Sequence, residues 1–201
     1  MIINSFLTFA VCYLIGCVPF SLIFTRFFAS KNPGIEGSGN YGAMNSYEIT
    51  NKKYIGILVF LFDCLKGALA VFITYNFIFP KSFYLVLATV SVVLGHTFNI
   101  FLKFKGGRGL ATTFGAIIIF NPFLGIIWGI IWLLFYFIIK KEIIFANIWA
   151  TLLTPLITFF APSYIIYFLN YNYLINIFEY RILTVIVCMI IFAGHFRSKK
   201  I

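Results

Sequence analysis

The chain is poor in charged residues, and above all in acidic ones. Of its 201 residues only 10% are charged, with 5 Asp and Glu against 15 Lys and Arg, whereas 62% are hydrophobic. A soluble domain carries about 25% charged residues, so the composition excludes an ordinary soluble protein. The apolar runs also lack the alternating polarity of barrel strands, and runs of about 20 residues predict membrane-spanning helices. We therefore expect an all-α integral membrane protein.

Metal, redox and nucleic-acid motifs are missing as well. The four cysteines lie in apolar runs without CxxC or Cys/His ligand spacing, so we expect neither a metal site nor disulfides. The sequence has a net charge of +10, but it contains neither a soluble basic region nor a recognisable nucleic-acid-binding motif. We therefore expect no nucleic-acid partner and assign the charge to membrane orientation, lipid headgroups or an anionic substrate. Because no repeat or linker divides the chain, residues 1–201 are interpreted as one domain.

Seven apolar segments are separated by polar or proline-containing connections. The first, Ile2 to Phe28, has no basic start, so we expect a permanent helix, kinked at Pro19, rather than a cleaved signal peptide. The fourth begins near Leu110 and stops at residues 121–122, which is short for a span. The fifth and sixth are interpreted as featureless apolar helices. The segments other than the first and fourth cover about residues 55–79, 83–99, 123–139, 143–160 and 182–193.

Basic residues gather in alternate connections. The connections after the first, third and fifth segments and the C-terminal tail hold most of the cations, and the intervening connections hold little besides Lys81 and Arg181. The positive-inside rule then places the N-terminus outside and the C-terminus in the cytoplasm. With this orientation all the polar chemistry is expected on the cytoplasmic side of the membrane.

The stretch 95–112 is the most polar part of this expected face. It combines His96, Lys105 and Arg108 with closely spaced glycines. Glycine lets backbone N–H groups converge on an anion, and neighbouring cations add charge, so the loop is suited to a phosphate. It is equally typical of a topology-determining loop with glycine turns. Both interpretations stay open at this point.

Two further patches are expected beside this loop. Residues 37–40 with Asn45 supply a hydroxyl and amides, and residues 195–198 supply an imidazole. Within the second apolar segment, Asp63 and Lys66 lie three residues apart and share a helical face. Charges at that depth are costly, so we expect them to pair, with a structural role favoured over a functional one.

These motifs resemble those of a known family, the bacterial acyl-phosphate-dependent glycerol-3-phosphate acyltransferases, which are seven-helix proteins of the cytoplasmic membrane. The family's GSGNPGATN is similar to GSGNYGAMN at residues 37–45. Its GHxFPxFLxFKGGKGVAT is similar to residues 95–112, with Asn99 for Pro and Arg108 for Lys. Its DxxKG pattern is similar to residues 63–67. The resemblance covers nearly the whole chain.

The resemblance implies transfer of an acyl chain from a long-chain acyl phosphate to the sn-1 hydroxyl of glycerol 3-phosphate in phospholipid biosynthesis. The product would be lysophosphatidic acid, formed without coenzyme A, a metal or another cofactor, at the cytoplasmic face of the bacterial inner membrane. Ser38 and His195 are implied as catalytic residues, whereas His96 is as typical of a structural role as of a catalytic one. The implied substrate-binding residues are Gly37, Gly39, Asn40, Asn45, His96, Lys105, Gly106, Gly107, Arg108, Gly109 and Ser198.

Several positions depart from the family pattern. Met44 stands where the family has Thr, and Glu48 stands where it has a substrate-binding Arg, which reverses a charge near the expected phosphate site. The family's serines after the fifth helix are replaced near Ile144 and Asn147, and its third motif, HRENIxRL, is reduced to residues 195–198. Two alternatives are therefore kept: a degenerate homologue that binds lipid or phosphate without turnover, and a small anion transporter.

Overall fold

The computed structural model describes residues 2–168 and 175–197, and all the regular elements in these two ranges are helices. In chain order they are α1 (Ile2–Gly16), α2 (Phe20–Ala29), α3 (Ala43–Thr50), α4 (Lys53–Ile73), η1 (Thr74–Ile78), α5 (Ser82–Thr97), η2 (Ile100–Leu102), α6 (Leu110–Ile118), α7 (Phe123–Leu134), η3 (Phe135–Ile139), α8 (Ile143–Phe160), α9 (Ser163–Phe168) and α10 (Ile177–Arg197). The prediction of an all-α membrane protein is confirmed.

Within the described residues, five helical segments are long and apolar enough to cross a membrane, and Phe123–Ile139 is a shorter apolar one. The fourth predicted segment, α6, has only nine residues, so the expectation of a short helix there is confirmed. The count of seven spans and the orientation of the termini stay predictions. Large apolar side chains cover much of the outside of the bundle, as a lipid environment requires.

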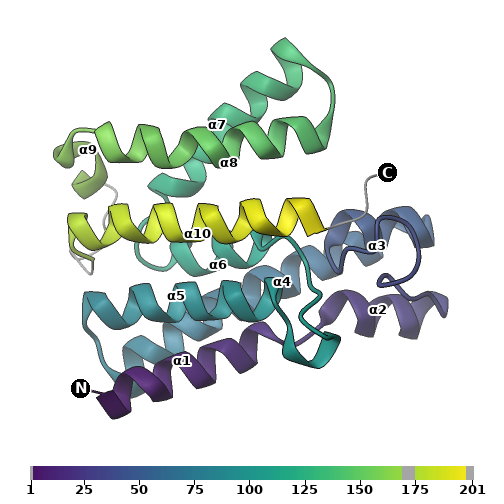
Figure 1. Ribbon diagram of the computed structural model, residues 1–201, viewed down its shortest axis with the longest axis horizontal. Coiled ribbons are helices and arrows are strands. Elements are labelled where there is room, and N and C mark those ends of the chain that lie inside the picture. Colours follow the sequence, from purple (N-terminus) through teal and green to yellow (C-terminus); the bar gives the residue numbers. More distant parts are fainter. Residues whose placement is uncertain (1, 169–174, 198–201) are drawn as a thin grey trace.

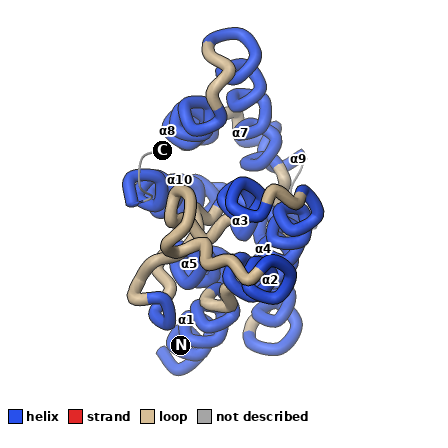
Figure 2. The backbone as a smooth tube through the Cα atoms, turned by 90° about the vertical axis from the view of Figure 1, so that its right-hand side faces the viewer, coloured by secondary structure: helices blue, strands red, loops and turns tan. Residues whose placement is uncertain are grey.

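The long helices lie roughly side by side (Figure 1). α5 packs against both α1 and α10, α4 packs against α6, and α7 and α8 form a hairpin that contacts α10. α2, α3 and the C-terminal end of α10 lie at the end of the bundle opposite the N-terminus. Seen from that end, the loops before α3 and after α5 gather among these helices (Figure 2). The polar connections therefore meet at one end of the molecule.

The first apolar segment was predicted to kink at Pro19, and the structure goes further there: α1 and α2 are separate helices. The break leaves backbone carbonyl groups without their helical partners. Two of these carbonyl groups accept hydrogen bonds from side chains elsewhere in the chain instead. Asn99 donates its amide Nδ2 to the Cys17 carbonyl oxygen at 2.6 Å, and the Lys66 Nζ donates to the Val18 carbonyl oxygen at 3.0 Å. The broken helix is thus tied to the core by hydrogen bonds rather than by apolar packing alone.

α4 and α6 cross so closely that only glycine fits at two points. A Cβ on Gly67 would lie 2.0 Å from the carbonyl oxygen of Thr112, and one on Gly115 would lie 1.8 Å from the carbonyl oxygen of Cys64. Small residues at such crossings let helix backbones pack directly inside a membrane. This contact holds the short helix α6 against α4.

Replacing Gly115 with alanine is expected to lower the free energy of unfolding by about 2 kcal/mol or more, because the added methyl group has to push two backbones apart. Gly129 in α7 is the matched control, since nothing lies within 4 Å of the position its Cβ would take. Gly129→Ala is expected to be neutral or to stabilise the helix by up to about 1 kcal/mol. Thermal unfolding of the two variants in the same detergent compares them, and equal midpoints would refute this account of the crossing.

One helix and one helix boundary differ from the sequence-based expectation. The polar connection between the first and second apolar segments contains a helix that the sequence did not predict, α3. α10 begins at Ile177, five residues before the predicted start. The extension is explained by Tyr180, which is fully buried and whose hydroxyl oxygen accepts a hydrogen bond from the Leu124 backbone N–H at 2.8 Å. Tyr180 thereby provides an acceptor for a backbone N–H in the first turn of α7.

Candidate active site

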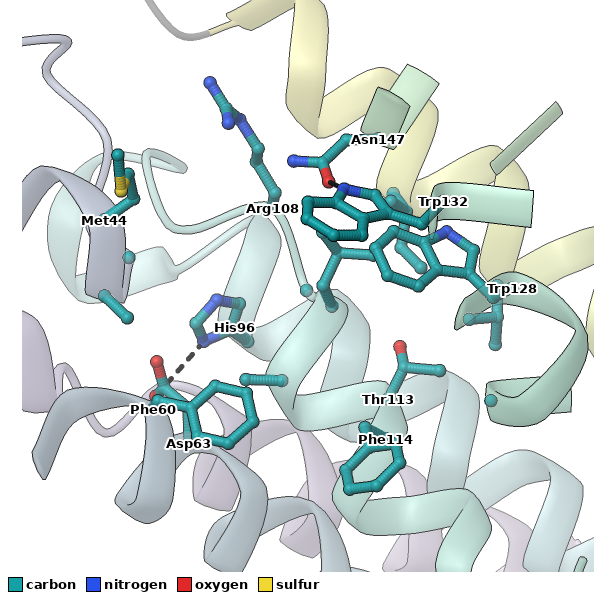
Figure 3. A pocket seen from close by; sticks show the side chains of 18 of the residues that line it. Met44, Phe60, Asp63, His96, Arg108, Thr113, Phe114, Trp128, Trp132 and Asn147 are labelled. Atoms are coloured by element: carbon teal, nitrogen blue, oxygen red, sulfur yellow. Dashed lines mark hydrogen bonds and ion pairs between the residues drawn. The ribbon is translucent and has the colours of Figure 1, made fainter. Parts of the chain in front are cut away.

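A cavity of about 650 Å³ lies beside the loop-bearing end of the bundle. Much of its polar lining comes from the α2–α3 connection with the start of α3, the end of α5 and the loop before α6, and α4 and α8 add further polar side chains. Its apolar lining comes mainly from α6, α7, α8 and α10 (Figure 3). Of the residues implied by the resemblance, the cavity is lined by Asn40, Asn45, His96, Arg108 and Gly109. A site with this division suits an amphipathic ligand that has a polar head and an apolar chain.

Asn45 organises the α2–α3 connection. Its side-chain Oδ1 accepts a hydrogen bond from the Ser38 backbone N–H at 2.9 Å. Its Nδ2 donates to the carbonyl oxygens of Pro33 at 3.0 Å, Glu36 at 3.3 Å and Asn40 at 2.9 Å. The amide therefore bonds to four points of one loop and fixes its shape. Contact between Asn45 and substrate stays a prediction.

Ser38 sits in this loop between two glycines with left-handed backbone conformations. The φ angles are 59° at Gly37 and 72° at Gly39, a region that glycine enters at little cost. Ser38 is buried and is not among the residues that line the cavity. Asn40 does line it, and its buried Oδ1 has no hydrogen-bond partner among the described residues. The loop thus presents the Asn40 amide to the cavity, whereas Ser38 is buried and does not line it.

The glycine-rich loop before α6 is folded onto the end of α5. The Gly107 N–H donates to the His96 carbonyl oxygen at 3.2 Å, and the Tyr41 N–H donates to the Gly106 carbonyl oxygen at 3.3 Å, which joins the two loops. A Cβ on Gly106 would lie 2.0 Å from the same His96 oxygen, and one on Gly107 would lie 2.1 Å from His96 Nε2. Close packing therefore requires both glycines, and the Gly107 N–H is already used within the protein.

The predicted pairing of Asp63 with Lys66 is confirmed. The Lys66 Nζ lies 2.7 Å from Asp63 Oδ1, and both side chains are 4% exposed. A third member was not predicted: His96 Nδ1 lies 3.5 Å from the same carboxylate oxygen (Figure 3). Because Asp63 and His96 both line the cavity, the buried ion pair borders the candidate site directly.

Arg108 lines the cavity and is the cation of the glycine loop that the structure brings there. Burial lowers the pKa of its guanidinium group below the ordinary value, and the Glu48 carboxylate acts in the opposite direction. The charge reversal at Glu48 is therefore within electrostatic range of Arg108. Lys105 is exposed and does not line the cavity. Gly109, with φ of 90°, precedes α6 and forms part of the cavity wall.

His195 lies near the end of α10, one turn beyond Ile191, a cavity-lining residue. It is buried, and its Nδ1 is 2.9 Å from the Ile191 carbonyl oxygen. Because a carbonyl can only accept, this bond fixes the Nδ1–H form of a neutral imidazole. A Cβ on the neighbouring Gly194 would lie 3.3 Å from the Arg108 Cα, so the end of α10 meets the glycine loop. Ser198 lies outside the described residues.

The interpretation of the fifth and sixth segments as featureless was wrong. In α7 and α8, the Trp128 Nε1 donates to Thr151 Oγ1 at 3.2 Å, and the Trp132 Nε1 donates to Asn147 Oδ1 at 2.7 Å. Both tryptophans and Asn147 line the cavity. A signal was present, because two of the chain's three tryptophans stand four residues apart, as do Asn147 and Thr151. Such spacing puts each pair on one helix face.

Comparisons with known proteins agree with this architecture. The protein-family model described as glycerol-3-phosphate acyltransferase matches residues 6–200. A glycerol-3-phosphate acyltransferase from Wolbachia sp. subsp. Brugia malayi (strain TRS) is 34% identical over 188 residues, which cover 89% of this chain and 97% of that protein. One from Pelagibacter ubique (strain HTCC1062) is 35% identical over 189 residues, which cover 94% of this chain and 88% of that protein.

Solved structures give the same comparison in three dimensions. The crystal structure of PlsY (YgiH), an integral membrane glycerol 3-phosphate acyltransferase, in its glycerol 3-phosphate form superposes with a TM-score of 0.75 at 26% identity, covering 95% of this chain and 88% of that chain. Its lysophosphatidic acid form superposes with a TM-score of 0.73 at 25% identity, covering 95% and 87%.

Proposed function

This chain belongs to the glycerol-3-phosphate acyltransferase family of membrane enzymes, and we propose that it takes its acyl group from a long-chain acyl phosphate. The acceptor is the sn-1 hydroxyl of glycerol 3-phosphate, and the products are lysophosphatidic acid and phosphate. We place the reaction at the cytoplasmic face of the bacterial inner membrane, where a soluble phosphate ester and a membrane-bound acyl donor can both reach the protein.

The division of the cavity lining is the observation that carries this proposal. Arg108, His96 and Asn40 supply a cation and hydrogen-bonding groups on the loop side, and the helices supply apolar walls. The loop side suits the phosphate groups of the two substrates, and the apolar walls suit the acyl chain. The volume of about 650 Å³ is in the range that buries a ligand of this size.

The chemistry needs no redox partner or metal. The sn-1 hydroxyl oxygen attacks the acyl carbonyl carbon and forms the ester bond, while the bond between that carbon and the phosphate oxygen breaks. Phosphate leaves with the electron pair, and the hydroxyl proton ends on the phosphate. Because the mixed anhydride is already activated, the protein's task is to hold hydroxyl and carbonyl in contact and to stabilise charge on the departing phosphate.

We assign the residues to the two substrates as follows. Ser38 and His195 serve the reacting acyl phosphate, with the backbone around residues 39–40. Arg108 binds the phosphate of glycerol 3-phosphate, assisted by Lys105 and by the backbone at residues 106–107, where the Gly107 N–H has to exchange its bond to the His96 carbonyl oxygen for one to the phosphate. Arg108 has the strongest support, because it lines the cavity.

The proposal is tested by giving the purified protein radiolabelled glycerol 3-phosphate with either palmitoyl phosphate or palmitoyl-coenzyme A. Labelled lysophosphatidic acid is expected with palmitoyl phosphate only. Product with the coenzyme A ester alone would overturn the donor assignment. No product with either donor would favour the degenerate homologue, and uptake of the label into sealed vesicles without product would favour the transporter.

Two substitutions that each remove one charge are expected to move the KM for glycerol 3-phosphate in opposite directions. Arg108→Gln removes the cation of the cavity and is expected to raise KM about tenfold to a hundredfold, since hydrogen bonds to charged groups contribute about 1.5–3 kcal/mol. Glu48→Gln removes the opposing carboxylate and is expected to lower KM about two- to fivefold, a smaller change because Glu48 is exposed. Initial rates at low salt measure both. A rise in KM for Glu48→Gln would contradict the placement of phosphate beside Arg108.

A further inference from the structure

Thr113 in α6 is a buried threonine whose hydroxyl group is left unpaired. The residue is 5% exposed, and its Oγ1 has no hydrogen-bond partner among residues 2–168 and 175–197. A threonine inside a helix can bond to the carbonyl oxygen four residues earlier, and other buried threonines of this chain do so: Thr8, Thr25, Thr74, Thr89, Thr151, Thr154 and Thr184. An unpaired buried hydroxyl group costs about 1–3 kcal/mol of stability, and a partner on a bound ligand would offset this cost.

The hydroxyl group of Thr113 is directed into the cavity. Thr113 lines the cavity together with Gly109, one turn before it, and the spacing puts both residues on one helix face. Figure 3 shows the Thr113 oxygen turned into the cavity and away from Phe114. Thr112 and Thr158 also have buried hydroxyl groups without a partner in the described part of the chain, but they do not line the cavity. A bound ligand can therefore reach the free hydroxyl group of Thr113, but not theirs.

Thr113 lies between the cation of the cavity and its apolar walls. Arg108 directly precedes Gly109, the residue before α6, and α6 rises about 6 Å from Gly109 to Thr113. One turn beyond Thr113 the wall continues with the apolar Ile117. In lysophosphatidic acid the three glycerol carbons separate the phosphate from the ester by a similar length. A ligand with its phosphate at Arg108 and its chain along the walls thus has its acyl carbonyl at the depth of Thr113.

We propose that Thr113 is a catalytic residue whose hydroxyl group donates a hydrogen bond to the carbonyl oxygen of the acyl group. When the sn-1 hydroxyl oxygen attacks, the carbonyl double bond opens and its oxygen gains negative charge. The double bond forms again when the bond to the departing phosphate breaks, and Thr113 keeps its proton throughout. A donor that is already in place stabilises the charged oxygen more than the neutral carbonyl, which lowers the barrier. This inference rests on the proposed function, which supplies the acyl group.

Thr113→Val keeps the shape of the side chain and removes the hydroxyl group. We expect kcat with palmitoyl phosphate to fall about a hundredfold, the usual effect of removing one donor to a developing oxyanion, while the KM for glycerol 3-phosphate stays within about twofold. The unfolding midpoint in detergent is expected to be equal or higher, because a methyl group replaces an unpaired buried hydroxyl group. A residue with a purely structural role would lose stability and activity together.

Thr158→Val is the matched control, because it removes a buried hydroxyl group that also has no partner among the described residues and does not line the cavity. Its kcat is expected to stay within about twofold of that of the unmodified protein. Thr113→Ser keeps the hydroxyl group and is expected to retain at least about a third of kcat. The proposal is overturned by Thr113→Val protein with nearly normal kcat, and equally by Thr113→Ser protein as slow as Thr113→Val.

The infrared spectrum of bound 1-palmitoyl lysophosphatidic acid, labelled with a heavy carbon isotope at its ester carbonyl, gives a readout that does not require turnover. Because a hydrogen bond lowers the carbonyl stretching frequency, we expect a lower frequency in the unmodified protein and in Thr158→Val than in Thr113→Val. Equal frequencies in all three proteins would refute the contact even if the enzyme is active. A frequency difference in a protein that forms no lysophosphatidic acid would support the contact and refute the proposed function alone.

Discussion

Replacing Asn45 with aspartate is expected to lower kcat/KM for lysophosphatidic acid formation at least about a hundredfold. The aspartate keeps the oxygen that accepts the Ser38 N–H, but it replaces the amide nitrogen by an oxygen that faces three loop carbonyl oxygens. Three hydrogen bonds of about 1 kcal/mol each become repulsive contacts. Because about 1.4 kcal/mol corresponds to a factor of ten in rate, a loop destabilised by 3 kcal/mol or so loses about two orders of magnitude.

The control for Asn45→Asp is Asn51→Asp, which adds the same charge at the exposed C-terminal end of α3. Asn51 has φ of 52°, a conformation that aspartate tolerates as well as asparagine does. This variant is expected to keep nearly full activity. Steady-state rates on purified proteins compare the two, and Asn45→Asp protein with more than about a tenth of normal kcat/KM would show that the loop does not depend on this amide.

Lys66→Met is expected to lower the free energy of unfolding by about 3–5 kcal/mol, which is the usual effect of removing one partner from a buried ion pair. The Asp63 carboxylate loses its ammonium partner at 2.7 Å, and the Val18 carbonyl oxygen at the break between α1 and α2 loses its donor. His96 alone cannot compensate, because its Nδ1 is 3.5 Å from the carboxylate. Thermal unfolding in detergent measures the loss.

Two further variants make this stability prediction specific. Lys53→Met removes an exposed lysine at the start of the same helix and is expected to leave the unfolding midpoint nearly unchanged. Adding Asp63→Leu to Lys66→Met removes the uncompensated carboxylate and is expected to restore part of the lost stability. A midpoint for Lys66→Met equal to that of the unmodified protein would mean that the pair does not hold the helices together.

Much of the architecture could be predicted because its signals are local. A proline inside an apolar run predicted a kink at Pro19, where the structure has a break between two helices. The i,i+3 spacing predicted the pair of Asp63 and Lys66, and the short run after Leu110 predicted a short helix. The glycine and asparagine motifs predicted that two loops and the end of α10 carry the site. Each of these features depends on residues only a few positions apart.

What the sequence could not predict depends on how helices are rotated against one another. His96 joins Asp63 only because α5 and α4 turn these faces together. Asn147 bonds to Trp132 only because α7 and α8 turn these two faces together. Asn45 was expected to bind substrate, and its bonds to the loop follow from a loop conformation that no local pattern specifies. Side-chain roles of this kind can be identified only once the arrangement of the helices in the bundle is known.

The short helix α6 has a consequence for biogenesis. Nine residues of α-helix extend about 14 Å, whereas the hydrocarbon core of a bilayer is about 30 Å thick. Such a segment cannot be retained in the membrane by its own partitioning when it leaves the ribosome. The segment is held instead by its glycine crossing with α4, a helix that is synthesised before α6. We therefore expect α6, and with it Arg108 directly before it, to be placed by tertiary folding against α4 rather than by the translocation machinery.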